Sequence, residues 1–190
     1  VDGGAYGERT LAANAADLER LELKQRVLRD VSAIGTDLSL FGRDWSMPVA
    51  LAPVGMAGMM ARRGETLAKA AADTAGIPFC LSTVGICSLE EVARVSDIPF
   101  WFQLYMLRDR GAVRELLQRA RDAGVQTLVF TVDLAVVGAR YRDVRNGMGG
   151  GVGPLGRLRG GLVSYMLHPQ WALDVGLGGK PHTFGSLTEY

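Results

Sequence analysis

Between residues 48 and 133 the sequence alternates short apolar runs with segments of helical periodicity, and this alternation limits the possible folds more than any other feature. Each repeat of strand and helix takes roughly 25 residues. Capping signals mark the helices, because Ser88 and Glu91 form a capping box and Gly76 and Gly124 follow helix ends. The expected strands lie at 49–53, 78–83, 100–106 and from 127 onward, and the expected helices at 65–75, 89–95 and 109–123.

Strands joined by helical crossovers predict a parallel sheet. A (β/α)8 TIM barrel typically needs about 250 residues, so four strands in this span are about half of one. A doubly wound sheet is the alternative, but it usually carries a phosphate-binding loop directly after its first strand. Here residues 53–59 read P-V-G-M-A-G-M and do not run directly into a helix. We therefore expect an α/β TIM barrel, of which this chain supplies about the first four βα units.

The segments before and after residues 48–133 lack this alternation of strands and helices. Residues 1–47 are expected to hold a lead-in helix at 10–23 and a small hairpin formed by 36–41 and 44–47. Residues 134–190 read as a long active-site loop region with short helical turns at 162–167 and 169–175. Both ends look incomplete, because the sequence begins without Met and ends within polar, turn-rich sequence. With about the first four βα units of a barrel between them, we interpret 1–190 as the N-terminal portion of a single domain.

Composition excludes several classes of function. A net charge of +1 without an aromatic-interleaved basic stripe argues against nucleic-acid binding. Two cysteines, Cys80 and Cys87, are too few for a disulfide framework and favour a reduced, cytosol-facing compartment. A membrane-spanning helix needs about 18 or more consecutive apolar residues, and the sequence has no such run.

Two apparent motifs fail when their context is considered. Residues 151–156 match G-x-G-x-x-G, but no strand precedes them and Pro154 lies inside, so we expect a loop and not a dinucleotide site. His168 and His182 have no second ligand or base partner at a useful spacing. No metal site is predicted.

Polar groups follow the expected strands at their carboxyl ends, where ligands bind in parallel α/β folds. Each has an ordinary alternative, such as a Gln that caps a loop, an Asp that caps a helix, or an Arg that is only solvated. Together they form a ring of hydrogen-bonding groups around one edge, with a cation nearby. The set is Gly55, Ser82, Gln103, Tyr105, Thr131 and Asp133, followed by Arg140.

These strand ends resemble those of the FMN-dependent α-hydroxy-acid dehydrogenases and oxidases. The matching motifs are A-P-V-G-M at 52–56, L-S-T at 81–83, W-F-Q-L-Y at 101–105, T-V-D at 131–133 and G-A-R at 138–140. D-G-G-A-Y at 2–6, M-A-R-R-G-E at 60–65, R-Y-R-D at 140–143 and H-P-Q-W at 168–171 are similar to the respiratory L-lactate dehydrogenase branch. The resemblance covers essentially the whole chain.

The resemblance implies FMN as cofactor and a role for each strand end. The backbone at Pro53, Val54 and Gly55 would face the flavin. Ser82, Gln103 and Thr131 would hydrogen-bond its isoalloxazine ring. Tyr105 would bind the substrate and act in catalysis, Asp133 would orient a histidine base, and Arg140 would hold the substrate's negative charge.

The implied activity is oxidation of an (S)-2-hydroxy acid, with L-lactate to pyruvate the expected reaction and a respiratory quinone the expected electron acceptor. The resemblance further implies a homo-oligomer, a tetramer in the family, on the cytoplasmic side of the inner membrane with peripheral contact. It places the base histidine and the carboxylate-binding arginine in a later motif that residues 1–190 do not contain, so the fragment alone is expected to be inactive. The alternatives are a non-catalytic half-barrel and a TIM-barrel enzyme that binds another phosphate ligand.

Overall fold

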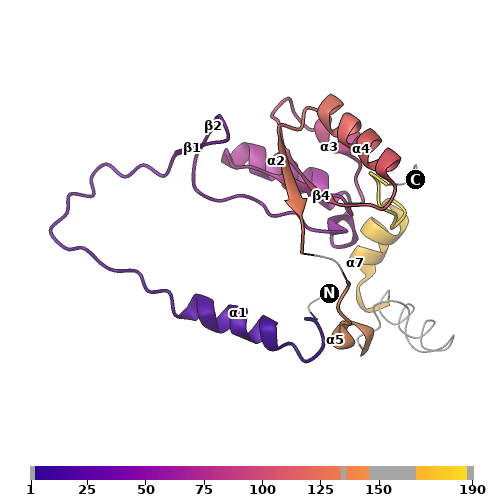
Figure 1. The fold of residues 1–190 in the computed structure, drawn as a ribbon, viewed down its shortest axis with the longest axis horizontal. Coiled ribbons are helices and arrows are strands. Elements are labelled where there is room, and N and C mark those ends of the chain that lie inside the picture. Colours follow the sequence, from indigo (N-terminus) through magenta and orange to yellow (C-terminus); the bar gives the residue numbers. More distant parts are fainter. Residues whose placement is uncertain (1–2, 134–135, 146–165, 188–190) are drawn as a thin grey trace. The chain divides into compact units, whose positions relative to one another are not determined.

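A computed structural model describes residues 3–133, 136–145 and 166–187. These residues divide into two compact units, one of residues 1–34 and 135–169 and the other of residues 35–134 and 170–190 (Figure 1). Among the described residues, no helix is long and apolar enough to cross a membrane.

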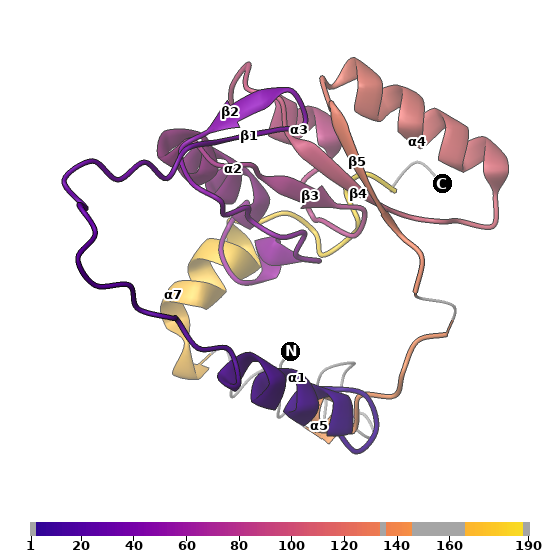
Figure 2. The ribbon, with the colours of Figure 1, turned by 60° about the vertical axis from the view of Figure 1, so that its left-hand side comes forward.

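The larger unit, residues 35–134 and 170–190, is built on a parallel sheet. Its strands are β3 (Cys80–Ser82), β4 (Trp101–Tyr105) and β5 (Thr127–Thr131), in the order β3-β4-β5 (Figure 2). Ser82 lies opposite Gln103, and Tyr105 lies opposite Thr131. The order of strands in the sheet follows their order in the chain, as expected for consecutive βα units.

The expected first strand, residues 49–53, is reduced to a single bridge. Leu51 pairs in parallel with Phe79; its amide donates to Pro78 O over 2.9 Å, and its carbonyl accepts from Cys80 N over 3.0 Å. Pro48 and Pro53 flank the segment and have no amide hydrogen to donate, which limits a longer ladder. The prediction was correct about the neighbour and direction but wrong about the length of the strand.

Three helices pack on one face of this sheet: α2 (Gly64–Ala75), α3 (Leu89–Ala93) and α4 (Arg110–Asp122). The predicted capping box is present, since the Ser88 hydroxyl accepts from Glu91 N and the Glu91 carboxylate accepts from Ser88 N. Gly76 and Gly124 have φ of 65° and 79°, left-handed values that favour glycine after a helix. The helical predictions are therefore confirmed within a residue or two at each end.

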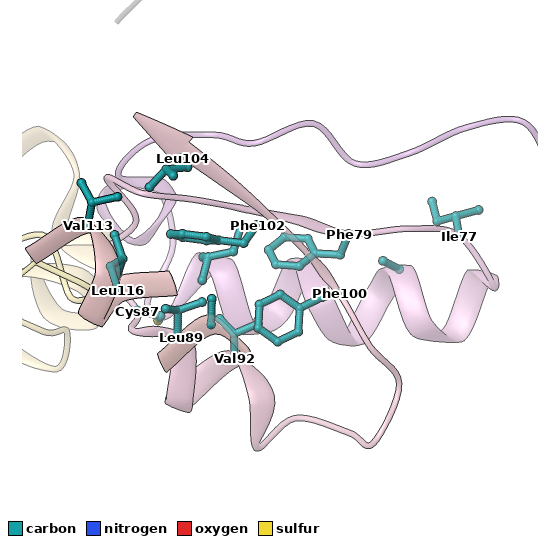
Figure 3. Close-up of a cluster of buried hydrophobic side chains, with 13 residues drawn as sticks. Ile77, Phe79, Cys87, Leu89, Val92, Phe100, Phe102, Leu104, Val113 and Leu116 are labelled. Carbon is teal, nitrogen blue, oxygen red and sulfur yellow. The ribbon is translucent and has the colours of Figure 1, made fainter. Parts of the chain in front are cut away.

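Strand alternation puts the apolar side chains of β3 and β4 against these helices. Phe102 and Leu104 point toward Leu116 and Val113 of α4 and form one cluster with Leu89 and Val92 of α3 (Figure 3). Burial of each large side chain contributes about 1.5–3 kcal/mol, so this cluster holds the helices on the sheet. Side chains alternate along a strand, so Ser82, which follows the buried Leu81, and Gln103, which follows Phe102, face the other side.

A hairpin covers the beginning of β4. Strands β1 (Leu38–Leu40) and β2 (Arg43–Trp45) pair antiparallel, which confirms the predicted hairpin. Its two loop residues, Phe41 and Gly42, both have positive φ, as in a type I′ turn. The ring of Trp45 meets Trp101 edge to face with centroids 6.4 Å apart, so the amino end of β4 is shielded by aromatic rings.

The C-terminal part of this unit contacts the loop that follows the bridge at Leu51 and the loop that follows β3. The π-helix η2 (Ala172–Leu177) comes directly after α7 (Pro169–Trp171). Trp171 Nε1 donates to Met59 O over 2.7 Å, and Gly185 N donates to Gly85 O over 2.9 Å. The helical turn expected at 169–175 is present, whereas the one expected at 162–167 lies mostly outside the described residues.

The smaller unit, residues 1–34 and 135–169, joins two segments that are far apart in sequence. It contains α1 (Arg9–Glu19), which ends four residues before the expected helix end, and α5 (Tyr141–Arg145). Tyr6 N donates to Ala139 O over 2.8 Å, and Gly3 N donates to Asp143 Oδ1 over 2.9 Å. The backbone of residues 3–6 is therefore held against residues 139–143.

Candidate active site

Three of the predicted flavin contacts form one chain of hydrogen bonds at the carboxyl ends of the strands. The Ser82 hydroxyl donates to Gln103 Oε1 over 3.1 Å, and Gln103 Nε2 donates to Thr131 Oγ1 over 2.7 Å. Gln103 is only 2% exposed, and such a buried amide is stabilised when its polar atoms have partners. The side chains come from three adjacent strands, so the sheet register positions them.

Thr83, to which the sequence analysis gave no role, fixes the end of β4. Its hydroxyl donates to Gln103 O and accepts from Tyr105 N over 3.2 Å, and its amide donates to Gln103 O over 3.0 Å. Thr83 is fully buried. The hydroxyl therefore extends the β3–β4 pairing beyond the strand and holds the backbone between Gln103 and Tyr105. In the sequence, the position of Thr83 in the L-S-T motif at 81–83 was the sign that this residue has a role at the strand end.

A cavity of about 360 Å³ opens beside this hydrogen-bonded chain. It brings Val54 from the first loop next to Ser82 at the end of β3. Its walls are mostly apolar with few polar groups, as is common for pockets that bind planar organic ligands. The lining residues are Leu51, Ala52, Val54, Ala57, Met60, Glu65, Ala68, Phe79, Cys80 and Ser82.

The loop that carries Pro53, Val54 and Gly55 is exposed but tied to the next loop. Met56 N donates to Val84 O over 2.9 Å. A Cβ on Gly55 would lie 2.8 Å from Val84 Cγ2, closer than real contacts of this kind. Packing against Val84 therefore requires a small residue here, in addition to the predicted close approach of a flavin.

The remaining predicted residues lie at the strand exits or in the other unit. Tyr105 ends β4 and is half-buried, and Asp133 follows β5 by two residues and is exposed. Arg140 belongs to the smaller unit, where its Nη1 lies 4.0 Å from Asp143 Oδ2. The structure therefore brings together Ser82, Gln103 and Thr131, whereas the roles expected of Tyr105, Asp133 and Arg140 stay predictions.

The two thiols are unsuited to act as nucleophiles. Burial raises the pKa of Cys80 to about 12, and burial together with the nearby Glu65 carboxylate raises the pKa of Cys87 to about 12 as well. Both thiols are thus neutral near pH 7, and the thiolate is the reactive form. This agrees with the interpretation of Cys80 as a small core residue.

The polar chain suits a flat heteroaromatic ring that presents carbonyl, ring-nitrogen and N–H groups along one edge, as isoalloxazine does. Thr131 Oγ1 already accepts from Gln103, so its own proton can be donated to a ligand. Ser82 and Gln103 supply a hydroxyl and an amide with both donor and acceptor atoms. The residues present therefore fit a flavin, with the apolar cavity beside them.

Residues 1–188 match the family described as FMN-dependent dehydrogenase. This chain belongs to the FMN-dependent dehydrogenase family. This match confirms the resemblance that was inferred from the strand ends.

Several relatives agree with this assignment. The chain is 58% identical to the L-lactate dehydrogenase of Caulobacter sp. (strain K31), covering 98% of this chain and 48% of that protein. It is 57% identical to the L-lactate dehydrogenase of Ectopseudomonas mendocina (strain ymp), covering 100% of this chain and 49% of that protein. The chain thus spans about half the length of these relatives.

Solved structures of relatives support the fold. A mandelate oxidase crystal structure superposes with a TM-score of 0.72 at 43% identity, over 76% of this chain and 42% of that one. A mandelate oxidase mutant, solved with a C4a-OH-FMN adduct, gives a TM-score of 0.72 at 42% identity, over 76% of this chain and 43% of that one. The parallel α/β arrangement of this chain is therefore that of these relatives over the matched part.

Proposed function

We propose that residues 1–190 supply the flavin-orienting half of an FMN-dependent L-lactate dehydrogenase with a (β/α)8 barrel. The observation that carries this proposal is the hydrogen-bonded chain Ser82–Gln103–Thr131 at the carboxyl ends of three parallel strands. In barrels this edge holds the active site. Relatives named L-lactate dehydrogenase, at 54–58% identity, favour lactate as substrate and pyruvate as product.

In this proposal the residues of this chain bind and orient. Bound FMN would supply the two-electron acceptor for the hydrogen on the substrate's Cα. Ser82, Gln103 and Thr131 would hold its ring in a fixed orientation, and the backbone of Pro53, Val54 and Gly55 would contact it. These contacts supply preorganised hydrogen-bonding groups in a site that is partly closed to water.

The substrate side of the proposed site uses the strand exits. Tyr105 donates a hydrogen bond to the substrate, and Arg140 offsets its carboxylate charge. Asp133 orients the imidazole that takes the hydroxyl proton, as a carboxylate does for histidine in other enzymes. The resemblance assigns that imidazole to a motif outside residues 1–190.

We further propose where the protein acts. Electrons pass to a respiratory quinone, and the protein forms a homotetramer at the cytoplasmic face of the inner membrane. Leu173 and Leu177 are 64% and 82% exposed on η2, and exposed apolar groups of this kind support peripheral contact with a lipid surface.

Anaerobic reduction by substrate tests the proposed function. The complete protein, loaded with FMN, should be yellow and should bleach on addition of L-lactate, with D-lactate as the stereochemical control and (S)-mandelate as the bulky one. A protein that binds FMN but keeps its flavin oxidised with all 2-hydroxy acids contradicts the proposed reaction. A protein that stays colourless contradicts the flavin site itself.

Substitution of Asp133 tests its role within this reaction. We expect Asp133→Asn in the complete protein to lower kcat by about 10²–10⁴-fold, because the amide no longer stabilises a charged imidazole. The KM for lactate should change much less. Asp122→Asn, at the end of α4, is the matched control and should keep both constants. An unchanged kcat in Asp133→Asn would remove the proposed role.

A second candidate function follows from β5. Leu128 and Phe130 are 45% and 47% exposed, so this strand presents an apolar face. A non-catalytic chain that pairs with a second copy through β5 would cover that face. Such a chain would stay colourless with FMN and elute as an oligomer, which separates it from the flavoenzyme.

A further inference from the structure

The carboxylate of Glu65 lies buried between two loops, the one that follows the bridge at Leu51 and the one that follows β3. It is 2% exposed, and its Oε1 accepts two backbone hydrogen bonds, from Gly58 N over 3.2 Å and from Ile86 N over 2.8 Å. Gly58 belongs to η1 (Ala57–Met59) in the first loop, and Ile86 lies in the loop after β3. One oxygen atom therefore joins two loops that leave different strands.

Packing around this oxygen keeps the two loops at a fixed separation. A Cβ on Gly58 would lie 2.9 Å from Ile86 Cβ and 3.2 Å from Glu65 Oε2. The hydrogen bond from Met56 N to Val84 O joins the same two loops a short distance away. The loops are thus held at two points, and a buried carboxylate makes one of them.

The surroundings of Glu65 indicate that it acts as a hydrogen-bond acceptor. No ion pair within the described residues includes it, and the carboxylate lies beside the buried Cys87 thiol, whose pKa it raises. It also lines the 360 Å³ cavity together with Val54 and Ser82. The carboxylate therefore connects the loop backbones at the wall of the candidate flavin site.

We propose that Glu65 is a positioning residue for the flavin site. It holds the loop that carries Val54 and Gly55 in register with Ser82, so that backbone and side-chain contacts meet the ring together. Displacement of a binding group by about 1 Å is enough to weaken a preorganised site. This inference rests on the proposed function, because it assigns Glu65 a task in FMN binding.

Removal of the acceptor should loosen both loops. Glu65→Leu replaces the carboxylate with a branched apolar group and leaves Gly58 N and Ile86 N without their partner. We expect the Kd for FMN to rise about tenfold or more, where tenfold is 1.4 kcal/mol. Amide hydrogen exchange at Gly58 and Ile86 should become faster in the apoprotein. Glu65→Gln retains a carbonyl oxygen and should bind FMN and exchange these amides as the wild type does.

A matched control separates this effect from general loss of stability. Asp73, on the same helix, contacts the buried Lys69 Nζ and accepts from Ser96 Oγ over 2.6 Å. Asp73→Asn should lower Tm but leave FMN affinity and exchange at Gly58 unchanged. Gly58→Ala disturbs the same pair of loops without changing Glu65. Its added methyl group should push Ile86 away and weaken FMN binding.

Wild-type FMN binding and reduction by lactate are measured first, since their failure removes the proposed function and not Glu65's contacts. If the wild type binds FMN, wild-type affinity and amide exchange in Glu65→Leu would overturn the positioning role. If Glu65→Leu does not fold, Glu65→Gln and Gly58→Ala decide. Normal affinity in Glu65→Gln with weakened affinity in Gly58→Ala supports the role, whereas weakened affinity in Glu65→Gln or normal affinity in Gly58→Ala overturns it.

Discussion

The two ends of β4 differ sharply in chemistry, although a single residue lies between Trp101 and Gln103, which represent them. At the amino end, Trp101 meets Trp45 and Phe41 of the hairpin, with ring centroids 6.4 and 5.5 Å away. Toward the carboxyl end, Gln103 joins Ser82 and Thr131 by hydrogen bonds. The aromatic end is shielded by apolar contacts, whereas the polar end opens beside a cavity.

This difference indicates a division of work along one strand. Apolar rings at the amino end contribute stability by burial, which needs no particular ligand. Hydroxyl and amide groups at the carboxyl end contribute less to stability but offer donors and acceptors to a ligand. Barrel enzymes show the same division between their two faces. Substitutions at the two ends should therefore affect different measurements.

The largest effect is expected at the aromatic end. Trp45 is almost fully buried, and Trp45→Ala should lower the free energy of unfolding by about 3–5 kcal/mol, because it leaves a large cavity beside Trp101. The FMN affinity of the folded protein should stay unchanged. Urea unfolding of the complete protein and flavin titration measure the two quantities.

Trp45→Phe provides the control for this prediction. It keeps an aromatic ring beside Trp101 and loses only a long hydrogen bond from Nε1 to Leu40 O, 3.4 Å. Its stability loss should be clearly smaller than that of Trp45→Ala. A large change in FMN affinity in either variant would show that the two ends are not independent.

The next effect is expected at the polar end. Gln103→Leu removes the central member of the hydrogen-bonded chain and leaves Ser82 and Thr131 without this partner. The Thr83 amide also loses its contact with Gln103 Oε1, 3.3 Å away, but keeps the backbone carbonyl of residue 103. We expect FMN affinity to fall by about tenfold to a hundredfold, with a stability loss of roughly 1–2 kcal/mol. Flavin fluorescence titration of the apoprotein measures the first, and urea unfolding measures the second.

The adjacent residue on the opposite face supplies the matched control. Leu104 is buried against the helices in the apolar cluster (Figure 3). Leu104→Ala should destabilise the protein by about 2–4 kcal/mol and leave FMN affinity unchanged. If Gln103→Leu kept wild-type affinity, the hydrogen-bonded chain would be a structural feature of the sheet and not a ligand site.

Much of this fold was predictable because its signals are local. Ser88 and Glu91 mark a helix start through their own side chains, and Gly76 and Gly124 mark helix ends through their backbone freedom. Ser82 and Gln103 were likewise expected toward the carboxyl ends of their strands, where the structure has them. The first strand was overestimated because prolines at 48 and 53 limit its ladder, and apolar composition does not report hydrogen bonding.

The contacts that join distant loops could not be predicted in the same way. Glu65 in a helical pattern reads as an ordinary residue of a first turn, yet it accepts hydrogen bonds from two other loops. Thr83 is adjacent to Ser82, but its hydroxyl bonds to β4 only because the register brings Gln103 opposite. Such roles depend on tertiary arrangement, which a single residue type does not encode.

The smallest effect is expected in the helix layer, away from both ends of β4. The Arg119 guanidinium, hydrogen-bonded to Glu90 over 2.9 and 3.2 Å, lowers the pKa of that carboxyl from 4.5 to about 2. Between these two values the unfolded chain binds more protons than the folded one. The stabilisation is therefore fully present above pH 4.5 and is lost as pH falls toward 2.

Glu90→Gln should reduce the pH dependence of unfolding in this window, by less than about 1 kcal/mol because the pair is partly exposed. Glu115→Gln, on the exposed side of α4, is the control and should keep the wild-type slope. FMN affinity near pH 7 should be equal in both variants, since the pair joins α3 to α4 and touches neither end of β4. A shifted FMN affinity in Glu90→Gln alone would mean that the helix layer and the polar end of β4 are coupled. Ligand binding would then depend on the helices that pack against the strand as well as on its carboxyl end.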